Sequence, residues 1–163
     1  MPCEIIRVDY QNNEHTRVLT HQLNEYCKTL LGFAQELPTE NLERLVPGLE
    51  SFGNSFALLA RKDGAWCGFA ICFLGFSTFK GKPLVNIHDL GVLPAYRNQG
   101  VGRALMQGIE AIAREKDCCK ITLETQTNNA PSRALYHSLG YQGTFLDDAV
   151  AGPQLFLTKE LGG

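Results

Sequence analysis

A short glycine-bearing segment, Arg97-Asn98-Gln99-Gly100-Val101-Gly102, has the residue types of an anion site. The apolar run before it, 84–92, predicts a buried strand, and the periodic segment after it, 101–116, predicts an amphipathic helix. N–H groups in the first turn of a helix have no acceptor within it, and the helix dipole favours negative charge there. Glycine lets a phosphate approach the backbone. Segment 97–102, called the anion turn below, is therefore predicted to bind a phosphate-like group.

Two common phosphate-binding motifs do not fit the anion turn. A Walker A loop needs Gly-Lys-Ser/Thr, which does not follow Gly102, and the dinucleotide fingerprint needs a third glycine where Leu105 stands. Arg-x-x-Gly-x-Gly by itself is also compatible with an ordinary turn. The ligand must therefore be judged together with a second motif.

That second motif begins at Asn129, continues through Ser132 to Tyr136, and ends at Gly140-Tyr141. The two segments together resemble the GNAT superfamily of acetyl-CoA-dependent N-acetyltransferases, whose patterns are R/Q-x-x-G-x-G/A and N-x-x-A-x-x-x-Y-x-x-x-G-F/Y. Ser132 departs from the second pattern, which has alanine there. The resemblance covers 55–141 well, and the earlier helices only by position.

The resemblance implies acetyl-CoA as acyl donor, with its pyrophosphate in the anion turn. It also implies that the pantetheine arm lies in a gap between 84–92 and a splayed parallel neighbour, 120–125, and pairs with backbone groups of the first. The residues expected to bind the cofactor are Leu90, Gly91, Val92, Arg97, Asn98, Gln99, Gly100, Val101, Gly102, Arg103, Asn129 and Tyr136.

Tyr136 is the first catalytic candidate, because the family's tyrosine at this position protonates the leaving thiolate or holds its sulfur. A simple thiol has a pKa of about 8.5, so protonating the leaving group is ordinary general-acid work. A tyrosine at the edge of the core is the alternative. Asn129 can cap its helix and bond the pantetheine at once.

Three residues are candidates for the general base. The family usually has a carboxylate on the central strand, and its polyamine acetyltransferases have Glu where His88 stands. Strand alternation puts Asn86 and His88 on one face and Asp89 on the other. A neutral histidine can serve as base, or His88 can merely line the pocket. Asp89 is the second candidate for the base, if a bulge in the strand reverses the alternation. Glu124, on the neighbouring strand, is the third candidate.

The acceptor is expected near the first two helices and the connection after Phe76. Four aromatic side chains could wall its pocket, and four acidic ones could attract an amine: Trp66, Phe73, Phe76, Phe79, Glu36, Glu40, Glu43 and Glu50. The resulting hypothesis is acetyl transfer to a small-molecule primary amine by direct attack in a ternary complex. A non-catalytic acyl-CoA sensor and a protein N-terminus or lysine acetyltransferase are the alternatives.

Composition limits the possible classes. The 163 residues suit one N-acetyltransferase domain, 1–163, and a net charge of −2 argues against bulk attraction to nucleic acid or a membrane. No run reaches transmembrane length and no signal peptide is evident, so a cytoplasmic protein is expected.

The six cysteines lack a C-x-x-C pair and are expected to be small buried hydrophobes. At most one of Cys118 and Cys119 is expected to be buried. No metal is expected, and a homodimer is possible.

The fold class expected is α/β (α+β), a mixed, mostly antiparallel sheet flanked by helices in the order β-α-α-β-β-β-α-β-α-β. Strands are predicted at 4–8, 55–61, 66–76, 84–92, 120–125 and 154–159, and helices at 16–31, 38–46, 101–116 and 129–139. Gly32 and Pro47-Gly48 are predicted helix ends, and Lys62-Asp63-Gly64 is a predicted hairpin turn.

Overall fold

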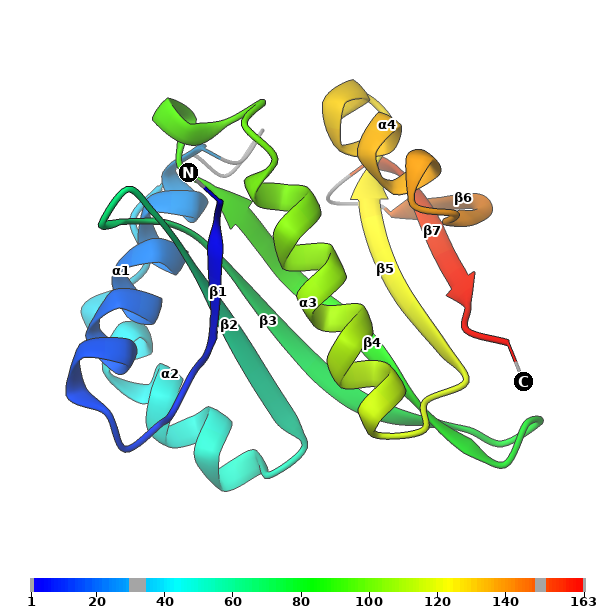
Figure 1. The fold of residues 1–163 in the computed structure, drawn as a ribbon, viewed down its shortest axis with the longest axis horizontal. Helices are drawn as coiled ribbons and strands as arrows, with labels where there is room; N and C mark the ends of the chain where they lie inside the picture. The colour runs from blue at the N-terminus through cyan, green and yellow to red at the C-terminus, as the bar shows by residue number, and fades with distance from the viewer. Residues whose placement is uncertain (1, 30–34, 149–151, 163) are drawn as a thin grey trace. The chain divides into compact units, whose positions relative to one another are not determined.

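The computed structural model describes residues 2–29, 35–148 and 152–162 (Figure 1). The helices and strands are β1 (Glu4–Arg7), α1 (Asn13–Thr29), α2 (Thr39–Phe52), β2 (Ser55–Lys62), β3 (Ala65–Ser77), β4 (Lys82–Val92), the 3-10 turn η1 (Pro94–Tyr96), α3 (Val101–Glu115), β5 (Lys120–Gln126), α4 (Ala130–Ser138), β6 (Gln142–Asp148) and β7 (Gly152–Glu160). The strands hydrogen-bond in the order β1-β2-β3-β4-β5-β7-β6. β4 and β5 are the parallel pair of a mostly antiparallel sheet, which confirms the expected fold class.

The chain forms two compact units. The first comprises Met1–Cys72 and Asp89–Ile109, and the second comprises Phe73–His88 and Glu110–Gly163. β3, β4 and α3 each continue from one unit into the other.

In the first unit, α1 and α3 cover opposite faces of β3. A side chain at Gly68 would meet Val101 and Leu105 of α3, whereas the ring of the next residue, Phe69, packs against Tyr26 of α1 at 5.7 Å between centroids. Successive strand residues point to opposite faces, so the two helices must lie on opposite sides. Figure 1 shows α3 in front of β3.

The β2–β3 hairpin turns at Asp63 and Gly64, as predicted. Both residues have positive φ, 50° and 79°. A type I′ turn requires this conformation at both central residues, and its twist matches that of the flanking strands.

Helix α1 begins three residues earlier than predicted. The Asn12 side chain accepts hydrogen bonds from the N–H groups of Glu14 and His15, at 2.9 and 3.1 Å. This cap fixes the start at Asn13, a signal that the apolar periodicity alone does not carry. The predicted end at Leu31 and the stop at Gly32 lie outside the described residues.

The prediction that Pro47-Gly48 ends the second helix is wrong. α2 continues to Phe52 and ends at Gly53, whose φ is 80° and whose N–H donates to the Leu49 carbonyl at 3.4 Å. Pro47 cannot donate to the Glu43 carbonyl, but both residues are exposed, so water can take the place of the missing donor. The cost of the proline is therefore reduced.

In the second unit, β7 lies between β5 and β6 and is antiparallel to both. The sequence analysis missed β6, because its sequence, QGTFLDD, lacks a clear apolar alternation and lies at the sheet edge.

The start and end of α4 follow the prediction. Asn129 accepts a hydrogen bond from the Ser132 N–H at 3.4 Å, and Gly140 has φ 90°.

All six cysteines are free, and four are buried: Cys67, Cys72, Cys118 and Cys119. The prediction that only one of the last two is buried is wrong, because strand alternation does not yet apply to them. They precede β5, and their N–H groups donate to the carbonyls of Ala113 and Pro83. Burial is the main cause that raises the pKa of most of these thiols, in the case of Cys67 to about 11.

Cys67 should make the fold less stable at alkaline pH. Its folded pKa is raised, so the unfolded chain loses the thiol proton first, and stability is lost as the pH rises from about 9 to about 11. In urea titrations, the unfolding free energy of both proteins should be measured at about pH 8 and about pH 10. The fall between these two pH values should be about 1 kcal/mol smaller in Cys67→Ala than in the wild type. The difference between the two proteins should be constant at lower pH. Parallel curves up to pH 10 would contradict this assignment.

Candidate functional site

The anion turn lies at the start of α3 in the first unit. Asn98 and Gly100 both have left-handed backbones, with φ of 59° and 82°. The first helical hydrogen bond runs from the Ala104 N–H to the Gly100 carbonyl, at 3.0 Å. The N–H groups of Val101 and Gly102 therefore lie in the first turn, where a helix supplies no acceptor. Since residues 97–100 are exposed, an anion can reach this turn from solvent.

Three long side chains brace the turn. Arg97 Nε donates to the Val92 carbonyl at 3.2 Å, and Gln99 Nε2 donates to the Ala95 carbonyl at 3.0 Å. Lys62 Nζ, from the end of β2, lies 3.3 Å from both the backbone oxygen and Oε1 of Gln99. The turn is thus held in shape and carries positive charge. The sequence analysis missed Lys62, because nothing near it in sequence connects it with the turn.

Leu90, Gly91 and Val92 form the end of β4 in the same unit. A Cβ on Gly91 would lie 2.7 Å from the ring of Phe69 and 2.8 Å from that of Tyr26. Glycine here lets the two rings pack edge to face directly against the strand. These contacts hold α1 close to the end of β4.

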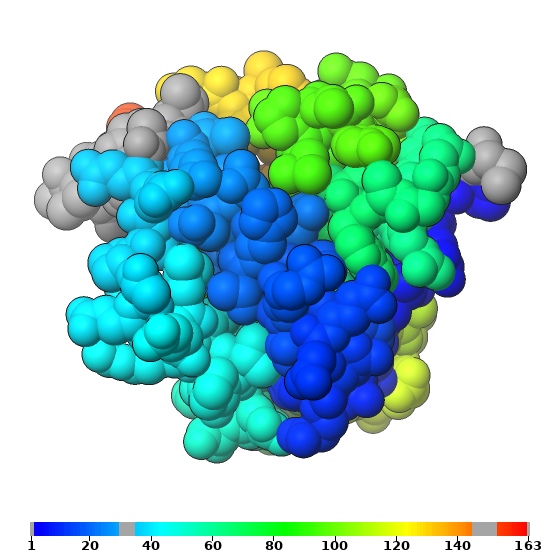
Figure 2. Space-filling view, turned by 90° about the vertical axis from the view of Figure 1, so that its left-hand side faces the viewer, coloured from blue at the N-terminus to red at the C-terminus, as the bar shows by residue number. Residues whose placement is uncertain are grey.

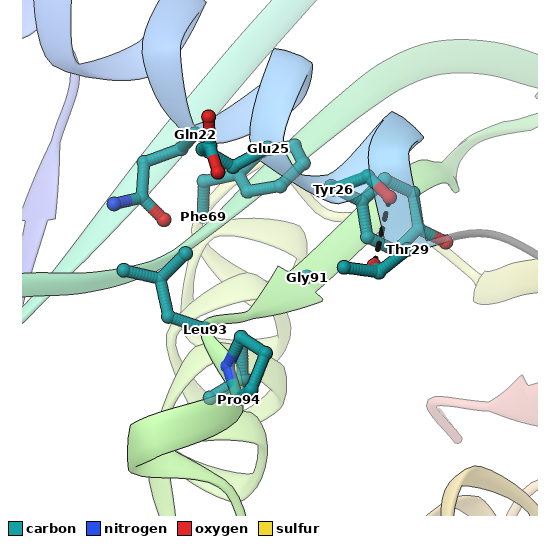
Figure 3. Close-up of a pocket in the computed structure, with 9 residues that line it drawn as sticks. Gln22, Glu25, Tyr26, Thr29, Phe69, Gly91, Leu93 and Pro94 are labelled. Carbon is teal, nitrogen blue, oxygen red and sulfur yellow. Dashed lines mark hydrogen bonds between the residues drawn. The ribbon is translucent and has the colours of Figure 1, made fainter. Parts of the chain in front are cut away.

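A pocket of about 90 Å³ lies between α1 and the end of β4. Its lining residues are Gln22, Glu25, Tyr26, Thr29, Phe69, Gly91, Val92, Leu93 and Pro94. Figure 3 shows the α1 side chains on one side and Leu93 and Pro94 on the other. Figure 2 shows the segment that follows β4 lying against α1 at the molecular surface.

The polar side of this pocket is formed by α1. Gln22 is 3% exposed and its Nε2 donates to the Trp66 carbonyl at 3.4 Å. The Thr29 hydroxyl donates to the Tyr26 carbonyl at 2.8 Å (Figure 3). Glu25 Oε1 accepts from Lys28 Nζ at 2.7 Å, and this hydrogen bond is the main cause that lowers the pKa of the carboxyl.

The aromatic and acidic side chains expected around the acceptor do not line this pocket. Phe76 and Phe79 are exposed, at 62% and 103%, and Trp66 donates its indole N–H to Glu14. The acidic residues proposed from sequence, Glu36, Glu40, Glu43 and Glu50, are also exposed. The carboxylate that does line the pocket, Glu25, was missed, because its place in α1 marks it only as one of several charged helix residues.

Tyr136 and Asn129 belong to the second unit. Tyr136 is 7% exposed, and its ring centroid lies 6.0 Å from that of Tyr141. Burial raises the pKa of the Tyr136 hydroxyl, and a hydrogen bond with the Ser132 side chain acts in the opposite direction. Ser132, the residue that departs from the motif, therefore touches the catalytic candidate itself.

The candidate bases differ in their surroundings. His88 is exposed and packs edge to face on Phe73 at 5.3 Å, while Asn86 on the same face donates to Thr122 Oγ1 at 3.0 Å. Asp89, in the first unit, lies near Cys27 and Cys72 and, after burial, is the next cause of the raised pKa of both thiols. Glu124 is exposed on β5.

The structure therefore brings together the end of β4, the anion turn and the pocket within the first unit. His88, Glu124, Asn129 and Tyr136 lie in the second unit, and their roles stay predictions. Among the described residues, no three His, Cys, Asp or Glu side chains are grouped as metal ligands. No helix in the described part of the chain is long and apolar enough to cross a membrane.

Comparisons with known proteins identify the family. The model of the acetyltransferase (GNAT) family matches residues 10–141, and the chain belongs to this family. It is 31% identical over 75 residues to the thialysine N-epsilon-acetyltransferase of Bos taurus, covering 46% of this chain and 44% of that one. It is 35% identical over 85 residues to the N-alpha-acetyltransferase RimI of Mycobacterium tuberculosis, covering 51% and 49%.

A solved structure shows the same fold. The structure of yncA from Salmonella typhimurium with its cofactor acetyl-CoA superimposes with a TM-score of 0.76 at 19% identity, covering 100% of this chain and 96% of that one. The sequence matches are shorter, since they span about half the length of the curated relatives.

The anion turn predicts a specific effect of Gly100→Ala. No atom lies within 4 Å of the added Cβ, so the cost arises from the left-handed backbone, about 1 kcal/mol. Altered N–H directions should weaken CoA binding about tenfold or more by calorimetry.

Gly53→Ala is the matched control, because Gly53 has φ 80° and ends α2, away from the turn. It should cost similar stability and leave CoA affinity unchanged. Equal affinity of Gly100→Ala and wild type would remove the turn from the phosphate site.

Proposed function

We propose that the chain transfers the acetyl group of acetyl-CoA to a primary amine. The observation that carries this proposal is the anion turn after β4, with a left-handed Gly100 and helix-start N–H groups that have no acceptor within the helix. Lys62 and Arg97 add positive charge at that turn. Membership of the GNAT family and the acetyl-CoA complex of yncA support the pyrophosphate as the ligand.

Residues of the anion turn would hold the donor in this proposal. The pyrophosphate accepts from N–H groups between Gln99 and Arg103, and the pantetheine pairs with the backbone of Leu90, Gly91 and Val92. The role of Asn129 in binding the pantetheine stays a prediction from the family resemblance.

Direct attack by the amine is supported by the state of the thiols. An acyl-enzyme needs an activated nucleophile, and a cysteine thiolate is one that could carry an acyl group. Burial raises the pKa of Cys67 to about 11 and also raises those of Cys3, Cys27, Cys72 and Cys118. These thiols are therefore protonated near neutral pH and poor acyl carriers.

Tyr136 assists the departure of CoA in this mechanism. Its raised pKa keeps the hydroxyl protonated, so it can donate a hydrogen bond to the sulfur as negative charge develops. Full transfer to a thiolate with a pKa of about 8.5 is uphill, which favours hydrogen-bond donation over complete protonation.

His88 is the proposed base. The attacking amine must lose a proton, since a free alkylamine has a pKa of about 10.4. His88 is exposed, so it can pass that proton to water. Asp89 is the alternative base.

The remaining proposals concern the whole protein. We treat residues 1–163 as one domain that acts on a small amine in the cytoplasm, and six free cysteines fit a reducing compartment. A homodimer stays a proposal. A protein N-terminus is the second candidate acceptor, favoured by the similarity to RimI, an N-alpha-acetyltransferase.

Thiol release from acetyl-CoA, measured with an amine panel and with peptides, tests the function. Tyr136→Phe should lower kcat by about 10²- to 10³-fold, because it removes the hydrogen bond to sulfur. The Kd of CoA should change little, since the ring keeps its packing. Tyr141→Phe is a control on the neighbouring ring. An unchanged kcat in Tyr136→Phe excludes this role, and tight CoA binding without turnover on any acceptor favours the sensor.

His88→Gln should remove the acidic limb of the kcat/KM profile. A histidine base is inactive once protonated, so wild-type activity should fall on the acidic side of the profile. Asp89→Asn is the comparison variant. If the acidic limb persists in His88→Gln and disappears in Asp89→Asn, the base is Asp89.

A further inference from the structure

We propose that the pocket between α1 and the end of β4 binds a second, non-reacting ammonium group of the acceptor. The acceptor is then a diamine, or a larger compound that presents an unbranched aminoalkyl arm. This inference rests on the proposed acetyl transfer and specifies its substrate class.

The pocket presents hydrogen-bond acceptors, while the donors of Gln22 and Thr29 are used in hydrogen bonds within the protein. The Gln22 amide uses Nε2 on the Trp66 carbonyl, which leaves Oε1 as its acceptor. The Thr29 hydroxyl donates its proton to the Tyr26 carbonyl, so its oxygen can still accept (Figure 3). A lysine-like ammonium has three donors and no acceptor. The polar side of the pocket therefore complements an ammonium group.

Charge favours the same ligand. Among the described residues that line the pocket, Glu25 is the only charged one. Its recorded contact with Lys28 uses Oε1 alone, and Lys28 also bonds Glu36 Oε1 at 3.0 Å. Oε2 can therefore accept from a ligand while Lys28 keeps both partners. The carboxylate disfavours ligands that carry a carboxylate of their own.

The ammonium bound here is not the attacking nitrogen. A nucleophilic amine must be neutral, whereas a carboxylate beside it stabilises the protonated form. The Glu25 hydrogen bond with Lys28, aided by its charge and that of His21, lowers the pKa of the carboxyl, so it is a weak base. A nitrogen in this pocket stays protonated, and a different nitrogen must attack.

Size limits the carbon chain. The pocket volume of about 90 Å³ is well below that of a cavity that takes benzene, about 150 Å³. The space therefore suits an ammonium on a short unbranched carbon chain better than a ring. Phe69, Leu93 and Pro94 supply the apolar contacts that methylene groups need.

Steady-state kinetics with 1,3-diaminopropane, 1,4-diaminobutane and their matched monoamines, propylamine and butylamine, test the proposal. The diamines should have KM values about tenfold or more below those of the monoamines. Glu25→Gln, which keeps the shape and removes the charge, should raise the diamine KM about tenfold. It should leave kcat and the KM of acetyl-CoA unchanged, which a general structural effect would not do.

Glu36→Gln is the matched control, because Glu36 bonds the same lysine but is exposed and outside the pocket. It should leave the diamine KM unchanged. Equal effects of the two variants would assign the effect to Lys28 and overturn the proposal. So would equal KM values for diamines and monoamines in an active enzyme. Absence of thiol release with every amine would instead overturn the proposed function itself.

Discussion

The parallel pairing of β4 with β5 is the constraint from which the location of the anion turn follows. Two parallel neighbours cannot be joined by a tight turn, so the chain must cross back, and here it does so through α3. The crossover helix has to begin at the carboxyl end of β4. Its unpaired N–H groups and positive dipole end are consequently fixed beside that strand end. The proposed anion site at this place would thus follow from topology, and Gly100 adds the left-handed backbone of the turn.

The features that the sequence predicted well have local causes. Gly100, the Asp63-Gly64 turn and the Asn129 cap each depend on the conformation of one or two residues, and those residue types have strong preferences. The features that were missed depend on partners distant in sequence. β6 exists because it pairs with β7, and α2 passes Pro47 because the affected carbonyl can bond water.

In the candidate site, too, the features with local causes were predicted and those that depend on distant residues were missed. The anion turn was predicted because its motif is contiguous, but Lys62, which reaches it from β2, has no sequence signal. The pocket was also missed, since it depends on the close approach of Tyr26 and Phe69 to a glycine. A glycine within a strand indicates only that another group comes near, and gives no indication of which one.

Local charge in the first unit would separate the two ligands of the proposed reaction. The net charge of the whole chain, −2, provides little steering for either. At the anion turn, Arg97 and Lys62 are positive, whereas the pocket on the α1 side has the carboxylate of Glu25. Both places border the end of β4, so one strand end presents opposite charge to an anionic donor and a cationic acceptor. Each ligand is disfavoured at the other's place, because like charges repel. In the proposed reaction this arrangement would order the ternary complex without a dedicated gate, and the fold around β4 would then favour an acceptor with a positive charge.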